Sequence, residues 1–468
     1  MVFNSLHFLV FFGIVTSAYF LLAHRFRWIW LLLASCYFYM AFVPVYLLIL
    51  LVTIVIDYWA GIYLEKFEGR TRKLFLAASL IANVGVLAVF KYYGFIASNV
   101  FHVTHWLGQE VHLPSLSILL PIGLSFHTFQ AMSYTIEVYR GNQKAERNFG
   151  IYSLYVMFYP QLVAGPIERP QNLLHQFYEE HTWDANRVKV GLLQMLEGFV
   201  KKVVIADRLA ILVDSVYASV GNQSRTHLIL ASVFYSFQIY CDFSGYSDIA
   251  IGAAKVMGFN LMDNFKAPYS AKSIPSFWRK WHISLSTWFK DYVYISLGGN
   301  RVSIPRWYLN ILIVFLISGL WHGASWNFVI WGFLHGFFQL LGFMINRQFP
   351  SLAADQVRGT LRIAFYRILT FALVNFAWVF FRLMHFSDIK TYFKQVYLNL
   401  PTTGSLGMNI PEIALSCLLI LVLYFWDLKG LALRKLPTKY FFLVVPTLVF
   451  VIYFLGVFSL KQFIYFQF

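Results

Sequence analysis

Long apolar stretches alternate with short polar connectors along the whole chain. A membrane-spanning helix needs roughly 20 consecutive, mostly apolar residues, so most of these stretches predict spanning helices. The stretch at 150–163 is too short to span comfortably and ends in AGPIERP, which predicts a re-entrant or interfacial segment. The apolar stretches lie near residues 3–22, 28–43, 45–63, 74–93, 115–137, 150–163, 192–218, 228–258, 307–321, 325–345, 361–383, 411–427 and 440–460.

This pattern predicts an all-α polytopic membrane protein, and the composition supports it. Of the 468 residues, 59% are hydrophobic and 12% are charged, whereas a soluble domain is about half apolar and about a quarter charged. Aromatic residues make up 20% of the chain, which suits lipid-facing walls and interfacial belts. We expect one integral membrane domain over residues 1–468, with N-terminal helices in 1–120, a chemically distinctive core in 121–346 and C-terminal helices in 347–468.

The charge distribution predicts the topology. The chain has 37 Lys and Arg against 21 Asp and Glu, a net charge of +16. The cations gather between apolar stretches, where positive-inside retention and anionic lipid explain them better than nucleic acid does. With the N-terminus outside, four clusters fall on the cytoplasmic side, and both termini are predicted to be extracytoplasmic. The clusters are Arg25 and Arg27; Lys66, Arg70, Arg72 and Lys73; Arg140, Lys144 and Arg147; and Lys429, Arg434, Lys435 and Lys439.

The beginning of the chain resembles a signal peptide only in being apolar. It lacks a basic n-region and a convincing cleavage site, and its positive charge follows the apolar run, so we expect a retained first span. No metal site is expected, because neither the cysteines nor the histidines of the outside loop predicted from Ser98 to Ser115 match a metal-ligand pattern. These residues are Cys36, Cys241 and Cys417, and His102, His105 and His112 with the nearby Glu110.

Polar residues inside apolar stretches concentrate between residues 121 and 336. The segment YCDFSGYSD, which begins at Tyr240, places Asp242 and Asp248 among hydroxyl groups that include those of Ser244 and Tyr246. An ionisable residue inside a membrane segment is costly and is a functional hypothesis by default. We expect this segment to line a polar cavity. The alternative is that Asp242 is a structural carboxylate satisfied by its neighbours.

Tryptophans, cations and a histidine crowd together in SFWRKWHISLS, which begins at Ser276. The pattern predicts an amphipathic helix at the cytoplasmic interface with its tryptophans at headgroup level. The cations would also suit the phosphates of coenzyme A or an acidic carrier protein. The residues concerned are Trp278, Arg279, Lys280, Trp281 and His282, followed by Lys290.

His322 lies between two strongly apolar stretches, in SGLWHGASW. A lone histidine there is more often a hydrogen bonder between helices than a catalyst. The small residues Gly319, Gly323, Ala324 and Ser325 favour catalysis, because we expect them to leave space for a substrate beside the imidazole. A neutral imidazole can act as general base when a hydroxyl attacks a thioester. No serine or cysteine nucleophile motif is present, so direct transfer is favoured over an acyl-enzyme.

Several long motifs within residues 121–336 resemble the membrane-bound O-acyltransferase family, most of all its bacterial branch of alginate O-acetylation and teichoic-acid D-alanylation proteins. The resemblance implies a bundle of about 10–13 membrane segments around a central tunnel. It also implies that His322 is the catalytic histidine and that His282 occupies the family's second signature position. The motifs are PIGLSFHTFQAMSY, FYPQLVAGPIERP, IYCDFSGYSDIAIGAAKVMGFNL, NFKAPYSAKSIPSFWRKWHISLSTWFKDYVYISLGGN and GLWHGASWNFVIWGFLHG.

The resemblance further implies an acetyl transferase of the bacterial inner membrane that needs no bound cofactor. The donor, acetyl-coenzyme A or another thioester, would enter from the cytoplasm, and its charged part would lie near Arg279, Lys280 and Lys290. The acceptor would be an extracytoplasmic polysaccharide such as alginate, another exopolysaccharide or peptidoglycan, reached directly or through a periplasmic, SGNH hydrolase-like partner. The expected tunnel lining is Asp242, Ser244, Tyr246, Trp278, Trp281 and Trp321.

Three other functions fit parts of the sequence. The first keeps the fold and changes the donor, so that D-alanine passes from a carrier protein to a cell-wall polymer. The second is a small-anion transporter with Asp242, His282 and His322 as a proton relay; the absence of an internal repeat argues against it. The third is a scaffold for polysaccharide export whose polar block only binds a partner.

Overall fold

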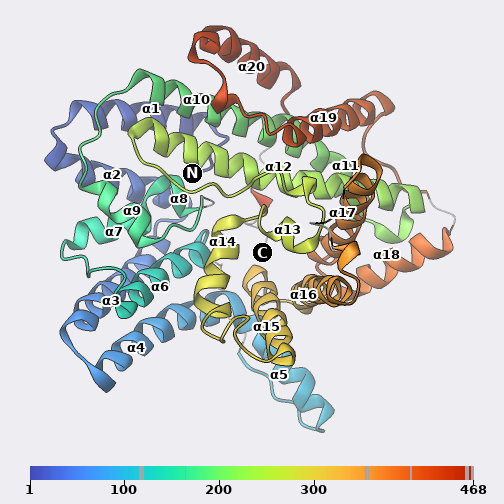
Figure 1. Ribbon diagram of the computed structural model, residues 1–468, viewed down its shortest axis with the longest axis horizontal. Helices are drawn as coiled ribbons and strands as arrows, with labels where there is room; N and C mark the ends of the chain where they lie inside the picture. The colour runs from blue at the N-terminus through green and yellow to red at the C-terminus, as the bar shows by residue number, and fades with distance from the viewer. Residues whose placement is uncertain are drawn as a thin grey trace. The chain divides into compact units, whose positions relative to one another are not determined.

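In the part of the chain that the computed structural model describes, all regular secondary structure is helical and no β-strand occurs (Figure 1). It describes residues 1–114, 121–163, 165–353, 356, 358–400, 403–458 and 463–464. The all-α class predicted from the sequence is therefore confirmed. The chain divides into two compact units: unit 1 comprises Met1–Met195 and Tyr246–Met262, and unit 2 comprises Leu196–Gly245 and Asp263–Phe468. The division into three sequence regions stays a prediction.

Unit 1 contains the N-terminal helices. They are α1 (Leu6–Leu21), α2 (His24–Met40), α3 (Tyr46–Lys66), α4 (Gly69–Leu87), a π-helical turn (Ala88–Tyr92), α5 (Tyr93–Trp106), α6 (Leu124–Arg140), α7 (Phe149–Met157), α8 (Tyr159–Leu162), α9 (Pro170–Leu173) and a 3₁₀ turn (Leu174–Phe177). Two longer helices, α10 (Ala185–Phe199) and α12 (Arg225–Met257), contribute residues to both units.

Helices α3, α4 and α6 pack against one another in unit 1 (Figure 1), and buried polar side chains help to hold them together. The Asp57 carboxylate on α3 accepts hydrogen bonds from the Ser79 hydroxyl (2.6 Å) and the Asn83 amide (2.8 Å) on α4. Ser79 Oγ also lies 3.0 Å from the Thr135 hydroxyl of α6. Polar groups in an apolar interior stabilise a fold only when they are paired, as these are.

Unit 2 contains the C-terminal helices and the segments that carry most candidate site residues. Its elements are a π-helical turn (Val200–Ala206), α11 (Asp207–Tyr217), α13 (Ile274–Trp278), α14 (Ile283–Phe289), a π-helical turn (Lys290–Tyr294), α15 (Ile304–His322), α16 (Trp326–Gln348), α17 (Thr360–Arg382), α18 (Phe386–Leu398), α19 (Ile410–Leu428) and α20 (Phe441–Leu455). Short 3₁₀ turns lie at Val220–Asn222, Pro268–Ser270, Pro350–Leu352, Leu433–Lys435 and Thr438–Tyr440.

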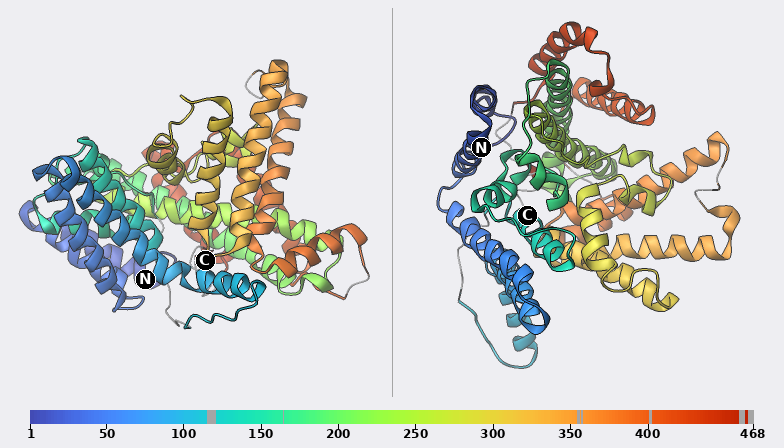
Figure 2. Two further views of the ribbon diagram at one scale, coloured as in Figure 1. Left: turned by 90° about the horizontal axis from the view of Figure 1, so that it is seen from below. Right: turned by 60° about the vertical axis from the view of Figure 1, so that its left-hand side comes forward.

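Helices α15 and α16 lie in backbone contact, and α17 packs beside α16 (Figure 2, left view, gold to orange). The closeness depends on glycine. A Cβ atom at Gly319 would lie 2.2 Å from the carbonyl oxygen of Phe328, and one at Gly332 would lie 2.2 Å from that of Phe315. Small residues at such crossings are the usual means by which membrane helices pack, because lipid supplies no hydrophobic force between them.

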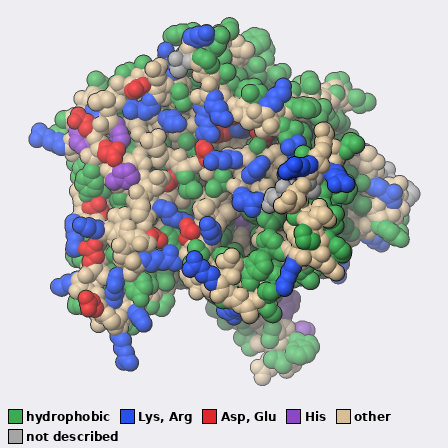
Figure 3. All heavy atoms as spheres, in the orientation of Figure 1, with side chains coloured by type: hydrophobic (Ala, Val, Ile, Leu, Met, Phe, Trp, Pro, Cys, Tyr) green, Lys and Arg blue, Asp and Glu red, His purple; other side chains and the backbone are tan. Residues whose placement is uncertain are grey.

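Within the described residues, six helices are long and apolar enough to cross a membrane: Tyr46–Lys66, Gly69–Trp106, Ile304–His322, Trp326–Gln348, Thr360–Arg382 and Ile410–Leu428. Two shorter apolar helices are α1 and α20. Large apolar side chains stay exposed along these helices, among them Ile81, Leu361, Ile368 and Phe442, as lipid-facing positions require. On the face drawn in Figure 3, hydrophobic side chains are widespread and Lys and Arg outnumber Asp and Glu.

Two local predictions can be compared with the structure. The segment that starts at Ser98 is not a loop, because the helix continues through the π-helical turn to Trp106 and includes His102 and His105. Ser115 lies outside the described residues.

The stretch at 150–163 forms only the short helices α7 and α8, so the prediction that it is too short to span is confirmed.

Candidate active site

His322 is the last residue of α15, at the turn into α16. The helix ends there because Gly323 is extended (φ −164°), and α16 begins because the Ser325 side chain accepts a hydrogen bond from the Asn327 N–H group. A serine before the first helical turn is a standard N-cap. The imidazole is 3% exposed, and aromatic rings surround it. Its centroid lies 4.9 Å from that of Trp321, 4.9 Å from that of Trp331 and 5.4 Å from that of Phe381.

The expectation that the neighbouring glycines leave substrate space beside His322 is wrong. A Cβ atom at Gly323 would lie 2.1 Å from the ring of Phe328, and one at Gly319 would meet the Phe328 carbonyl oxygen at 2.2 Å. The missing side chains therefore allow α15 and α16 to approach, and protein atoms already fill the space. Space for a substrate must come from elsewhere in the unit.

His282 interrupts the helix predicted for SFWRKWHISLS. The segment forms two short helices, α13 and α14, because His282 has left-handed backbone angles (φ 44°, ψ 55°). A non-glycine residue in this region is strained by about 1–3 kcal/mol, and such residues concentrate at functional sites. Both Trp281 and His282 are fully buried, at 1% and 0% exposure. The prediction that they belong to one interfacial amphipathic helix is therefore wrong.

Asn264 holds the His282 ring in one tautomer. The Asn264 Oδ1 atom lies 3.1 Å from His282 Nδ1, and it also accepts from the backbone N–H (3.3 Å) and hydroxyl (2.9 Å) of Ser284. Because Oδ1 is an acceptor, Nδ1 carries the hydrogen and Nε2 keeps its lone pair. Burial lowers the pKa of His282 to about 3. The imidazole is thus neutral and oriented.

The two histidines share an aromatic neighbour. The Trp321 ring centroid lies 6.2 Å from that of His282 and 4.9 Å from that of His322. Phe243 on α12 also packs against His282, with their ring centroids 4.6 Å apart. The two histidines of the signature motifs therefore belong to one aromatic cluster within unit 2.

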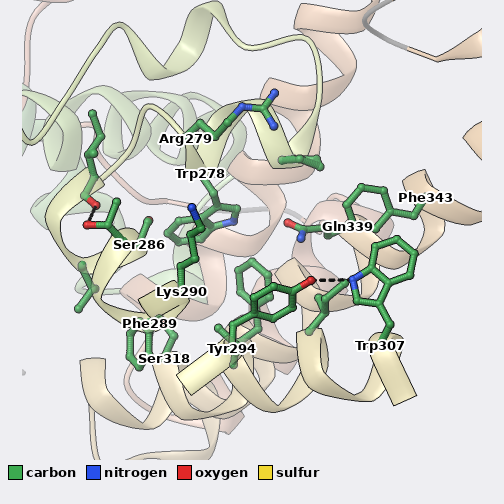
Figure 4. Close-up of a pocket in the computed structure, with 17 residues that line it drawn as sticks. Trp278, Arg279, Ser286, Phe289, Lys290, Tyr294, Trp307, Ser318, Gln339 and Phe343 are labelled. Carbon is green, nitrogen blue, oxygen red and sulfur yellow. Dashed lines mark hydrogen bonds between the residues drawn. The ribbon is translucent and has the colours of Figure 1, made fainter. Parts of the chain in front are cut away.

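A cavity of about 530 Å³ lies in unit 2, between α13, α14, α15 and α16 (Figure 4). Three of the predicted donor-site residues line it: Trp278, Arg279 and Lys290. Most of its remaining wall is apolar, and Ser318, one helical turn before His322, lies in the wall. Arg279 and Lys290 are exposed. The size and lining are those of a small-molecule site with a few convergent polar groups.

Lys280 and Trp281 lie outside the wall of this cavity. The Lys280 ammonium donates a hydrogen bond to the Ser270 hydroxyl (2.6 Å), and burial, followed by the nearby Arg367 guanidinium, lowers the pKa of this ammonium. Trp281 packs in the core, with its ring centroid 5.1 Å from that of Trp378. Of the three cations predicted to meet the donor, the structure brings Arg279 and Lys290 to the cavity and gives Lys280 a different partner.

Asp242 is engaged by a buried cation. Its carboxylate lies 2.6 Å from the Lys202 ammonium, which also lies 2.9 Å from the Asp207 carboxylate. The backbone N–H of Ile464 donates to the other Asp242 oxygen (2.7 Å). These contacts agree with the alternative that Asp242 is a structural carboxylate satisfied by its neighbours. Its role in a tunnel stays a prediction.

The other residues of the YCDFSGYSD segment separate between the units. Ser244 is buried in unit 2, whereas Tyr246 belongs to unit 1, where its hydroxyl lies 3.2 Å from Asn4 Oδ1. Within the described part of the chain, no group of three or more His, Cys, Asp or Glu residues could hold a metal ion.

Sequence reasoning missed residues that the fold brings to the site. Asn264 opens one of the family motifs, but its place there does not show that it contacts His282. Lys202 lies outside these motifs, and its contact with Asp242 depends on the fold. His335 and Gln339 do have a signal, because they follow Trp331 at successive turns of one helix. Gln339 lines the cavity, and His335 packs against two rings of the site, Trp278 and Trp331.

Comparison with known proteins agrees with this architecture. The model of the membrane-bound O-acyltransferase family matches residues 16–384. A probable alginate O-acetylase (AlgI) of Pseudomonas aeruginosa is 37% identical over 450 residues, which are 94% of this chain and 84% of the relative. A peptidoglycan O-acetyltransferase of Helicobacter pylori is 37% identical over 381 residues (76% of this chain, 70% of the relative).

A more distant relative, the teichoic acid D-alanyltransferase of Bacillus subtilis, is 25% identical over 291 residues, 58% of this chain and 69% of the relative. The family match spans most of the chain, and the long relatives share more than a third of its residues. The chain belongs to the membrane-bound O-acyltransferase family and is an O-acyltransferase of the membrane.

Proposed function

We propose that the protein transfers an acetyl group from acetyl-coenzyme A on the cytoplasmic side to a polysaccharide outside the membrane. The names of the more similar relatives support the acetyl group and the class of acceptor, since these proteins are named for alginate and peptidoglycan O-acetylation. The acceptor class is thus an extracytoplasmic polysaccharide, reached directly or through a periplasmic, SGNH hydrolase-like acetyltransferase.

The observation that carries the proposal is the cavity between α13, α14, α15 and α16. Its exposed cations, Arg279 and Lys290, suit the phosphates of coenzyme A, because an ionised partner strengthens a hydrogen bond. Its apolar wall suits the arm that ends in the thioester. Ser318 lies in that wall, one helical turn before His322. We infer that the thioester passes from the cationic rim toward the imidazole.

In the reaction, His322 acts as general base. The acceptor O–H bond breaks and the proton passes to the imidazole, while the acceptor oxygen forms a bond to the thioester carbonyl carbon. The C–S bond then breaks, and the leaving thiolate takes the proton back from His322. A positioned base of this kind contributes about 10² to 10⁴ in rate. The water-poor aromatic surroundings of His322 strengthen its interaction with the reacting charges.

We assign His282 a positioning role in this scheme. Its neutral, oriented ring contacts Trp321, which in turn contacts His322. The strained backbone at His282 forms the turn between α13 and α14. Trp278 and Arg279 precede this turn and the cavity-lining residues of α14 follow it, so the turn positions both parts of the cavity wall. His282 is thus placed between the wall of the donor cavity and His322, the proposed base.

D-alanyl transfer from a carrier protein is the second candidate. The distant similarity to teichoic acid D-alanyltransferases supports it, and exposed cations at the cavity would also suit an acidic carrier. The difference in identity, 37% against 25%, favours acetyl transfer.

The donor can be identified with purified wild-type protein in nanodiscs. Acetyl-coenzyme A labelled in the acetyl group is added in a single-turnover amount, and thiol release and acceptor labelling are followed. In a parallel sample the donor is a D-alanyl carrier protein. We expect thiol release from acetyl-coenzyme A alone. Release from the carrier protein alone contradicts the acetyl proposal and favours D-alanyl transfer.

A further inference from the structure

His335 lies in a box of aromatic rings in the interior of unit 2. It is on α16, one helical turn after Trp331, and its side chain is 0% exposed. Its ring centroid lies 4.9 Å from that of Trp278 and 5.0 Å from that of Trp331. The ring centroids of Phe277 and Phe315 each lie 6.3 Å from that of His335, and both rings are nearly parallel to the imidazole. We call these five residues the aromatic box.

The polar atoms of the aromatic box lack hydrogen-bond partners in the described part of the protein. They are His335 Nδ1, His335 Nε2, Trp278 Nε1 and Trp331 Nε1, and all four are buried. Buried polar groups in native proteins almost always have a partner, which is a bound molecule where no protein atom serves. The box therefore has the properties of a binding site.

The chemistry of these atoms defines the ligand. An indole N–H group only donates, and a neutral imidazole has one donor and one acceptor. Donors therefore predominate, and the ring faces around them offer no other polar group. A carbonyl oxygen that gains negative charge fits this donor set. Preorganised N–H donors in a dry site are the usual means of stabilising such an oxyanion.

The box adjoins both the cavity and the base. Trp278 and Phe315 belong to the box and also line the cavity, as does Gln339, one turn after His335. On the other side, Trp331 contacts both His335 (5.0 Å) and His322 (4.9 Å). A thioester that enters through the cavity would thus bring its carbonyl to the box while the carbonyl carbon faces His322.

We propose that His335, Trp278 and Trp331 form the oxyanion site of the reaction. As the acceptor oxygen bonds to the carbonyl carbon, the C=O π electrons move to the carbonyl oxygen, and the N–H groups of the box donate to it. When the C–S bond breaks, these electrons return and the carbonyl is restored. This inference rests on the proposed acetyl transfer and adds catalytic residues to it.

The test uses His335→Phe and Trp331→Phe, which keep an aromatic ring and remove the polar atoms. We expect each to lower kcat for thiol release by about 10² to 10³-fold, as for other oxyanion donors, with little change in KM for acetyl-coenzyme A. Thermal unfolding should stay unchanged or rise, because an apolar ring replaces unpaired polar atoms. His335→Gln, which keeps an N–H donor, should recover part of the rate.

The control is Trp59→Phe, an exposed tryptophan of α3 in unit 1 that should leave kcat unchanged. Wild-type kcat in His335→Phe and Trp331→Phe would show that the aromatic box is only packing and would overturn this inference alone. Absence of thiol release by the wild-type protein would overturn the proposed function and this inference with it.

Discussion

The imidazole of His322 meets the indole of Trp331 edge to face, with their centroids 4.9 Å apart and their planes at 84°. This geometry is favourable for aromatic pairs, and it fixes the direction in which the imidazole points. Trp331 is fully buried and is held in turn by Trp378 and Phe381. His322, the proposed base, therefore lies in an aromatic frame, and Ser318, one helical turn before it on α15, lines the cavity.

The cavity cations give a prediction about donor binding. We expect Arg279→Ala and Lys290→Ala each to raise KM for acetyl-coenzyme A by about three- to tenfold, since each removes an exposed charge–phosphate interaction. Because these groups lie away from the reacting atoms, kcat should change little. Steady-state kinetics at several salt concentrations measure this, and the effect should shrink as salt increases.

Lys280→Ala is the matched control for the cavity cations. The Lys280 ammonium is bound to Ser270 and lies outside the cavity wall, so its removal should leave KM unchanged. An increase in KM for Lys280→Ala alone would contradict the proposed position of the donor phosphates.

Much of this fold was predictable because it depends on local pattern. Apolar length predicted α3, α15, α16, α17 and α19, and the positions of proline and of polar residues predicted where the unusual chemistry lies. The long helix through Trp106 was underestimated because its last turns carry histidines, although Gly108, with a positive φ, follows its end.

The candidate site was only partly predictable, because its geometry depends on contacts between distant segments. The motifs identified His282 and His322, but the left-handed turn at His282 and its bond to Asn264 are tertiary features. Gly319 and Gly323 were interpreted as substrate space, since a sequence does not show that Phe328 fills it. The partner of Asp242, Lys202, was missed for the same reason.

The glycine contact between α15 and α16 predicts a loss of stability on substitution. Gly332→Ala places a Cβ atom 2.2 Å from the Phe315 carbonyl oxygen, and the helices must separate. Such overpacking costs about 1–3 kcal/mol. Thermal unfolding in detergent should show a lower Tm. Gly342→Ala on the same helix is the control, because no atom lies within 4 Å of its Cβ position, and an equal loss there would refute the packing role.

The ion pair between Asp242 and Lys202 predicts that substitution of Asp242 lowers the stability of the protein and leaves donor binding unchanged. Asp242→Asn removes one of the two carboxylates at the Lys202 ammonium, and breaking a buried ion pair typically costs about 3–5 kcal/mol. We expect a lower Tm and less protein in the membrane, with KM for acetyl-coenzyme A unchanged in the protein that folds. A raised KM at wild-type stability would instead support the tunnel role predicted from the sequence.

The buried His282 predicts how stability depends on pH. Its pKa is about 3 in the folded protein and 6.5 in the unfolded chain, so the unfolded chain takes up the proton first as pH falls. The stability contribution of the neutral ring is complete above pH 6.5 and is lost as pH falls from there toward 3. The loss is about 1.4 kcal/mol per pH unit within this window. Tm measured from pH 7 to pH 5 should fall less steeply in His282→Asn than in the wild type. Parallel slopes would mean that folding leaves the pKa of His282 unchanged and would contradict this prediction.

The most direct test of the account is single-turnover acetyl transfer by His322→Ala. The variant and the wild type are purified in nanodiscs at equal amounts, and His385→Ala, which removes an exposed histidine at the start of α18, is the control. We predict that thiol release falls by about 10² to 10⁴-fold in His322→Ala, that it is unchanged in His385→Ala, and that all three proteins unfold at the same temperature. Release at the wild-type rate by His322→Ala would contradict the claim that His322 is the base of the reaction.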